Sequence, residues 1–121
     1  MEQGKLPHQH PHTHRAEKLT GQLTRLGDFV VVSEVFKQLA DPSRARIFWL
    51  LCHCEECVIN IAALVDMSSP AVSHHLRQLK DSGLITARRE GKEVYYKVSD
   101  TEVCQLLHRS VEQMMSVTCP R

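Results

Sequence analysis

The amino-acid sequence predicts a mainly α-helical fold with one small β-hairpin, an α+β arrangement. Apolar residues recur at helical spacing, as Val31, Val35 and Leu39 do in the first half of the chain. Apolar and polar residues alternate, as is typical of strands, within residues 84–98 on either side of a turn at Gly91. These observations favour several helices, then a hairpin, then a last helix.

Most of the chain is expected to form one domain, preceded by a flexible tail. Residues 1–15 contain a histidine at every second position from 8 to 14, two prolines and no apolar periodicity. Alternating histidines can chelate a soft or borderline cation, but a flexible tail without further ligands binds it weakly. The tail histidines are His8, His10, His12 and His14. Residues 16–121 are the expected folded domain.

The composition is that of an ordinary globular protein and argues against several classes. Hydrophobic residues make up 42% and charged residues 24% of the chain, and the net charge of +1 neither favours nor excludes nucleic acid as a partner. No apolar run approaches the ~20 residues that span a bilayer, and the N-terminus lacks the apolar segment of a signal peptide. We therefore expect a cytoplasmic protein that does not enter a membrane. No recognisable catalytic triad, phosphate-binding glycine loop or carboxylate pair is present, so we do not expect an enzyme.

Helix boundaries follow from apolar periodicity and from capping residues. Asp41 and Ser69 each precede a proline and are expected to cap helices that begin at Pro42 and Pro70. Gly83 is expected to follow the end of the second of these helices. The helices are predicted over approximately residues 16–26, 29–39, 57–67 and 70–81, and a further helix begins at residue 42 and ends between residues 52 and 55. In this further helix, Arg44 and Arg46 are expected to point into solvent.

Two short helices separated by a brief turn, residues 57–67 and 70–81, have the layout of a helix-turn-helix. In the second helix, Val72, Leu76 and Leu79 share one apolar face. The opposite face carries hydroxyl, imidazole, guanidinium and amide groups but no carboxylate, and such groups can bind phosphates and base edges in a major groove. This outer face consists of Pro70, Ser73, His74, Arg77 and Gln78, whereas His75 is expected nearer the buried side.

The hairpin adds local positive charge that the net charge conceals. Arg88, Arg89 and Lys92 lie near its tip, so the hairpin can act as a wing that contacts the DNA backbone or minor groove beside the second helix. The sequence therefore predicts binding to double-stranded DNA. The expected DNA-binding residues are Ser69, Pro70, Ala71, Ser73, His74, Arg77, Gln78, Arg88, Arg89, Lys92 and Tyr95.

Four segments, in this order along the chain, carry a resemblance to a known family. They are Phe36-Lys37-Gln38-Leu39-Ala40-Asp41-Pro42-Ser43-Arg44, Ser69-Pro70-Ala71-Val72-Ser73-His74-His75-Leu76, Leu79-Lys80-Asp81-Ser82-Gly83-Leu84 and Gly91-Lys92-Glu93-Val94-Tyr95-Tyr96. With them, residues 35–98 resemble the ArsR/SmtB family of metal-responsive repressors. The resemblance implies a winged helix-turn-helix homodimer, built largely on its first and last helices, that binds operator DNA and is released by an inducer.

The resemblance places one metal site at the start of the helix before the recognition helix, where the family has Cys-Val-Cys and an acidic residue. The matching residues 57–60 lack the second thiolate and the acid. Three thiols instead lie within six positions, and an odd total of five cysteines argues against disulfides. Thiolates suit zinc, cadmium, lead, arsenite or copper(I) as the inducer. The expected ligands are Cys52, Cys54 and Cys57, with His53 and the tail histidines as further candidates. For Cys52 alone, a small buried side chain is an equally good interpretation.

A second family site lies on the last helix and uses carboxylates and histidines across the dimer interface. Asp100 lies where that pattern starts, but the usual distal histidine positions fall on Gln113 and Ser116, which are poor ligands. The modified set would be Asp100, Cys104, His108 and Glu112, of which the last three are spaced by four and share one helical face. An exposed polar stripe explains this face better than a metal site does. Leu107, Val111 and Met114 form an apolar face suited to dimerisation.

Two alternative functions fit the same sequence. The repressor could sense thiol oxidation or persulfides through Cys52 together with Cys104 or Cys119, as some relatives do. The fold could also serve as a metal-buffering or protein-interaction module that does not read DNA. Release of DNA by an oxidant without metal would identify the first alternative, and a lack of sequence-selective duplex binding would identify the second.

Overall fold

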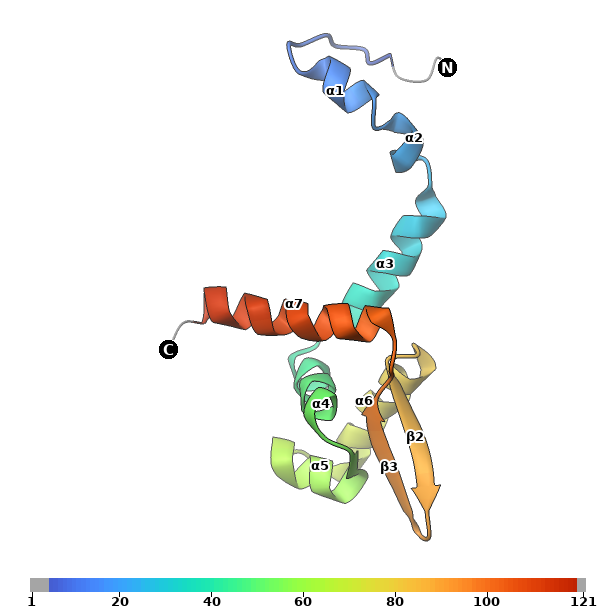
Figure 1. The fold of residues 1–121 in the computed structure, drawn as a ribbon, viewed down its shortest axis with the longest axis vertical. Coiled ribbons are helices and arrows are strands. Elements are labelled where there is room, and N and C mark those ends of the chain that lie inside the picture. The colour runs from blue at the N-terminus through green and yellow to red at the C-terminus, as the bar shows by residue number, and fades with distance from the viewer. Residues whose placement is uncertain (1–4, 120–121) are drawn as a thin grey trace. The chain divides into compact units, whose positions relative to one another are not determined.

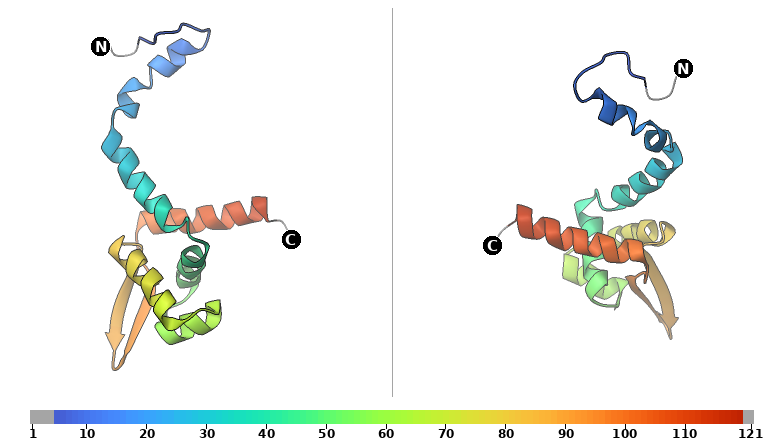
Figure 2. Two further views of the ribbon diagram at one scale, coloured as in Figure 1. Left: turned by 180° about the vertical axis from the view of Figure 1, so that it is seen from behind. Right: turned by 45° about the horizontal axis from the view of Figure 1, so that its top comes forward.

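The computed structural model describes residues 5–119, and the chain divides into an N-terminal unit, residues 1–34, and a C-terminal unit, residues 35–121. The N-terminal unit contains α1 (Thr13–Glu17), α2 (Thr20–Leu23) and the first part of α3 (Leu26–Gln38). The C-terminal unit contains the remaining elements, which Figures 1 and 2 show in three orientations. These are α4 (Pro42–His53), β1 (Glu56–Cys57), α5 (Val58–Val65), α6 (Ser69–Asp81), β2 (Ile85–Glu90), β3 (Glu93–Val98) and α7 (Glu102–Thr118).

The N-terminal unit differs from the single polar helix predicted over residues 16–26. Two short helices, α1 and α2, occupy this region, and α1 begins within the segment that was expected to be flexible. Local hydrogen bonds hold the preceding residues against α1: the Leu6 amide donates to Glu17 Oε2 at 2.8 Å, and the His10 amide donates to Thr13 Oγ1 at 2.7 Å. The rings of His8 and His10 stack with their centroids 6.1 Å apart. The first four residues of the predicted tail lie outside the described part of the chain.

The core of the C-terminal unit is formed by the apolar stripes of its helices. The stripe predicted on α6, Val72, Leu76 and Leu79, is fully buried. It packs with side chains of α4, α5, α7 and the start of β2, because each helix is amphipathic and buries one face. The other core residues are Ile47, Phe48, Leu51, Ile61, Ala62, Val65, Leu84, Ile85, Cys104 and Leu107. The predicted α+β class is confirmed, and no described helix is both long and apolar enough to cross a membrane.

The hairpin is part of a three-stranded antiparallel sheet with strand order β1-β3-β2. Strands β2 and β3 are joined by a two-residue turn in which Gly91 has a φ of 63°, a left-handed conformation that favours glycine. Strand β1 was not predicted, because a strand of two residues has no recognisable alternation of polar and apolar side chains. Its Glu56 pairs with Tyr96 and its Cys57 with Tyr95. The segment that contains the clustered cysteines is therefore attached to the hairpin.

Capping residues fix the helix starts nearly as predicted. Asp41 caps α4, since its Oδ1 accepts a hydrogen bond from the Arg44 amide at 2.9 Å. The cap of α6 is Ser68 rather than the predicted Ser69: Ser68 Oγ accepts from the Ala71 amide at 3.3 Å. The helix therefore starts one residue earlier, with Pro70 in its second position. The predicted stop after α6 is confirmed, because Gly83 has a φ of 81°.

The prediction that Arg44 points into solvent is wrong. Only 9% of Arg44 is exposed, and its guanidinium donates from Nε to the Gln38 carbonyl at 2.6 Å and from Nη2 to the Lys37 carbonyl at 3.0 Å. The last carbonyls of a helix have no partner within that helix, so a buried guanidinium supplies the missing donors at the end of α3. Sequence periodicity does not reveal this contact, because it depends on how the chain turns between α3 and α4.

We predict that Arg44→Met lowers the free energy of unfolding by about 2 kcal/mol, because it removes two charged donors and leaves two carbonyls unpaired. Chemical denaturation at a fixed protein concentration would measure this change. Arg109→Met, an equivalent substitution at an exposed position of α7, is the control and should leave the stability nearly unchanged. Equal effects of the two substitutions would contradict the structural role of Arg44.

Candidate nucleic-acid interface and metal ligands

Helices α5 and α6 form a helix-turn-helix with a three-residue turn, residues 66–68. Asp66 ends α5 in the left-handed conformation with a φ of 56°, which turns the chain sharply toward α6. The buried stripe of α6 faces the core and therefore leaves the opposite side of the helix outward. The β2–β3 hairpin extends beside α6 and away from α7 (Figure 1). This arrangement is a winged helix-turn-helix.

The outward side of α6 presents the predicted polar groups. Ser69, Pro70, His74 and Arg77 are exposed, and Ala71, Ser73 and Gln78 are half-buried. The Gln78 amide nitrogen lies 3.4 Å from His74 Nε2, so these two side chains lie together on the surface. His75 lies on the inner side as expected: its side chain is 12% exposed, with Nε2 3.9 Å from Asp41 Oδ1. The outward side therefore carries donors and no carboxylate near the start of the helix.

The wing holds one of its three predicted basic residues in internal contacts. Arg88 donates to both carboxylate oxygens of Glu55, at 2.9 and 2.7 Å, and to Glu90 Oε2 at 2.8 Å. Its guanidinium also lies 4.9 Å from the centre of the Tyr95 ring. Arg89 and Lys92 are exposed. Arg88 thus fastens the wing to the residues that follow α4, while Arg89 and Lys92 are the free cations at the tip among the described residues.

The three clustered cysteines lie where α4 ends and α5 begins. Cys52 is half-buried on α4, Cys54 is exposed and caps α4, and Cys57 is half-buried and precedes α5. The Cys54 thiol donates to the Leu50 carbonyl at 3.5 Å. Burial, with smaller effects from Cys104 and Glu112, raises the pKa of Cys52 to about 12. Within residues 5–119, these thiols do not gather into a set of three ligand atoms around one point.

The remaining two cysteines, Cys104 and Cys119, differ in their exposure to solvent. Cys104 is 2% exposed, and its thiol donates to the Leu84 carbonyl at 3.4 Å, so it is a core residue rather than part of a polar stripe. Cys119 is exposed at the end of α7. The thiolate is the form of cysteine that reacts with oxidants and that binds metal ions, so the raised pKa of Cys52 disfavours both roles for this thiol in this conformation.

The described residues bring together one set of three metal-binding side chains: His53, His108 and Glu112. Their ligand atoms all lie within 4.8 Å of one another. The sequence suggested His53 as a partner of the cysteines, and His108 and Glu112 as partners of Asp100 and Cys104. The combination was not predicted, because His53 belongs to α4 and the other two residues belong to α7. The only signal in the sequence is a histidine near the end of one helix and a pair spaced by four on another.

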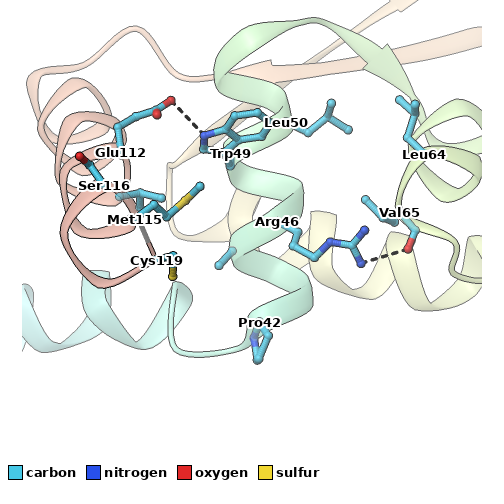
Figure 3. A pocket seen from close by; sticks show the side chains of 12 residues that line it. Pro42, Arg46, Trp49, Leu50, Leu64, Val65, Glu112, Met115, Ser116 and Cys119 are labelled. Carbon is cyan, nitrogen blue, oxygen red and sulfur yellow. Dashed lines mark hydrogen bonds between the residues drawn. The ribbon is translucent and has the colours of Figure 1, made fainter. Parts of the chain in front are cut away.

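A groove with a volume of about 940 Å³ runs between α4, α5 and α7. Figure 3 shows Trp49 at one end, directed toward Glu112, and Arg46 directed toward the carbonyl of Val65. Trp49 Nε1 donates to Glu112 Oε1 at 3.0 Å, and Arg46 Nη1 donates to the Val65 carbonyl at 3.1 Å. Apart from Ser116, the remaining lining is apolar or carries a thiol: Pro42, Ala45, Leu50, Leu64, Val111, Met115 and Cys119.

Comparison with known proteins places this geometry in a family. Residues 41–87, from the cap of α4 into β2, match the family described as bacterial regulatory protein, arsR family. A protein of Synechocystis named transcriptional repressor SmtB homolog is 34% identical over 85% of this chain and 78% of its own length. The chain belongs to the arsR family. Because this is a family of regulatory proteins, it agrees with the expectation that the chain is not an enzyme.

Two further relatives of this arsR-family chain are informative. A Staphylococcus aureus protein named cadmium resistance transcriptional regulatory protein CadC homolog is 41% identical over 65% of this chain and 66% of its own length. A solution structure from Mycobacterium bovis is described as a homodimeric winged helix-turn-helix DNA-binding domain of a possible ArsR-family regulator. It has a TM-score of 0.65 and 34% identity, covering 74% of this chain and 85% of that one. The predicted family and winged-helix fold are confirmed.

We predict that the pKa of Glu55 lies below its ordinary value of 4.5 and rises toward it in Arg88→Gln. The hydrogen bonds from Arg88 are the main cause of the lowering, and Lys97 adds a smaller one. Because the pKa is lowered by folding, the pair stabilises the protein above the ordinary pKa and loses this effect as the pH falls through the lowered value. Titration of the Glu55 carboxyl carbon by NMR would measure it. Arg89→Gln is the control and should leave the pKa of Glu55 unchanged. An unchanged pKa of Glu55 in Arg88→Gln would refute the prediction.

Proposed function

We propose that this arsR-family protein is a cytoplasmic transcriptional repressor that binds double-stranded operator DNA as a homodimer and leaves it when a metal ion is bound. The observation that carries the proposal is the outward side of α6, where Ser69, His74 and Arg77 are exposed without a neighbouring carboxylate. Such a side can enter a major groove while the wing follows the flanking backbone. The printed names of the Synechocystis and Staphylococcus relatives support the repressor and metal parts of the proposal.

Exposed apolar side chains support dimerisation. On α7, Leu106 is 57%, Met114 55% and Val117 68% exposed, and α3 exposes a further apolar run. A second copy of the chain would cover such surfaces, which soluble monomers seldom leave open. The homodimeric description of the Mycobacterium bovis relative supports the same arrangement. A dimer would also present two recognition helices to two operator half-sites.

The thiols of Cys54 and Cys57, with Cys52 as a third candidate, are the proposed ligands of the inducing ion. Zinc, cadmium, lead, arsenite and copper(I) all suit thiolate ligands. The two ligand cysteines flank Glu55, whose carboxylate holds Arg88 of the wing, and Cys57 itself pairs with β3. An ion that draws the cysteines together would shift this segment and with it the wing. By linkage, metal and DNA then weaken each other's binding by the same factor.

We predict that one of these metals lowers the affinity of the reduced protein for its own upstream promoter DNA by about 5- to 150-fold. The double variant Cys54→Ser and Cys57→Ser should still bind this DNA but should no longer respond. Cys119→Ser, at an exposed thiol outside the segment, is the matched control and should respond normally. Fluorescence anisotropy of labelled DNA would follow both affinities. If none of these metals changes the affinity for DNA, the proposal that a metal is the inducer is refuted. If the protein does not bind this DNA selectively, the proposal that it is a repressor is refuted.

We also predict that Arg89→Gln weakens DNA binding at low salt and reduces the slope of log K against log salt by about 0.9, the effect of one lost phosphate contact. Arg109→Gln removes the same charge from α7 and should leave the slope unchanged. The measurement is a series of operator titrations at increasing salt. An unchanged slope in Arg89→Gln would show that the tip of the wing does not contact the DNA backbone.

A further inference from the structure

His53, His108 and Glu112 lie together at the place where the end of α4 meets α7. We propose that these three side chains form a binding site for a borderline divalent cation such as Zn²⁺, separate from the thiols of Cys54 and Cys57. The site uses His53 Nε2, His108 Nε2 and Glu112 Oε1. It is neither of the two sets that the sequence suggested, and the inference does not depend on the proposed function.

The three ligand atoms form a nearly equilateral triangle. His53 Nε2 lies 3.3 Å from Glu112 Oε1, His108 Nε2 lies 3.2 Å from His53 Nε2, and His108 Nε2 lies 3.2 Å from Glu112 Oε1. Ligands at the corners of a tetrahedron, about 2.0–2.1 Å from a zinc ion, lie about 3.3–3.4 Å from one another. The triangle therefore has the size of one face of a tetrahedral zinc site.

Hydrogen bonding alone does not account for the triangle. Each imidazole Nε2 carries at most one proton, and Glu112 Oε1 is an acceptor when ionised. If both imidazoles donate to Glu112, their two N–H groups face each other at 3.2 Å. If one imidazole donates to the other, one of the remaining contacts brings two lone pairs together. At most two of the three contacts can be hydrogen bonds at the same time, whereas a cation accepts all three lone pairs.

The fold positions these groups by two facing pairs spaced by four residues. Trp49 and His53 lie one turn apart on α4, and His108 and Glu112 lie one turn apart on α7. The Trp49 indole N–H donates to Glu112 Oε1 at 3.0 Å and so holds the carboxylate in place. The ring of His53 packs between the Trp49 ring, at 4.3 Å, and the His108 ring, at 4.8 Å. Such outer contacts orient metal ligands in known sites.

The donor set indicates which cations would bind. Two imidazole nitrogens and one carboxylate oxygen suit Zn²⁺ and similar first-row ions, whereas the soft ions that need thiolates are expected at the cysteines. The side chains of His53, His108 and Glu112 are 44%, 30% and 46% exposed, so solvent reaches the site and water can complete the coordination. A bound ion would fasten the end of α4, just before the cysteine segment, to α7.

The test is a Co²⁺ titration of the reduced, full-length chain carrying His8→Gln, His10→Gln, His12→Gln and His14→Gln together with Cys54→Ser and Cys57→Ser. These changes remove the tail histidines and the proposed thiol site. We expect one Co²⁺ per chain, with visible d–d absorption and no thiolate charge-transfer band. Trp49 is the single tryptophan, so paramagnetic Co²⁺ at this site should quench its fluorescence, and added Zn²⁺ should restore it.

The decisive variants are His108→Gln and Glu112→Gln in the same background, and each should weaken Co²⁺ binding at least about tenfold. In Glu112→Gln, the amide oxygen still accepts the bond from Trp49, so loss of metal would not reflect loss of the helix contact. His74→Gln, at an exposed position on α6, is the control and should bind normally. Absence of quenching in the background protein, or unchanged affinity in His108→Gln, would overturn the proposal. Neither result depends on whether metal releases DNA.

Discussion

Burial of the inner face of α4 is the constraint on which the rest of the C-terminal unit depends. Ile47, Phe48 and Leu51 are almost fully buried, and burying each such side chain contributes about 1.5–3 kcal/mol. Helices α5, α6 and α7 and strand β3 all pack against this helix. Once the inner face is fixed, the helical repeat also fixes what the other faces present: Trp49 and His53 are turned toward α7, and the chain leaves α4 at Cys54.

The parts of the fold that could be predicted from sequence are those that depend on local spacing. The buried stripe of α6, the cap at Asp41 and the turn at Gly83 each follow from residues a few positions apart. The parts that could not be predicted depend on how separate elements meet. Arg44 was misjudged because its partners are carbonyls at the end of α3. For the same reason, periodicity identified the face shared by His108 and Glu112, but nothing in α7 indicated that His53 faces it.

The wing and the cysteine segment are linked by direct contacts rather than through the core. Strand β1 lies between Cys54 and α5 and pairs with β3, and Glu55 in the same segment binds Arg88 in β2. A change of conformation after α4 would therefore reach the hairpin without repacking Ile61 or Leu76. Arg88, although basic and near the tip, is held by Glu55 and Glu90 and so fixes the position of the wing. Arg89 is exposed on the surface.

The strand order β1-β3-β2 leaves β2 as an outer strand of the sheet, with unpaired backbone groups along one side. Such an edge can pair with the edge of another molecule and so begin aggregation. The last three residues of β2, Arg88, Arg89 and Glu90, are all charged and exposed. Pairing a second strand against them would remove these charges from water, which costs free energy. The charged end of the hairpin therefore disfavours association of two copies of the chain through the edges of their sheets.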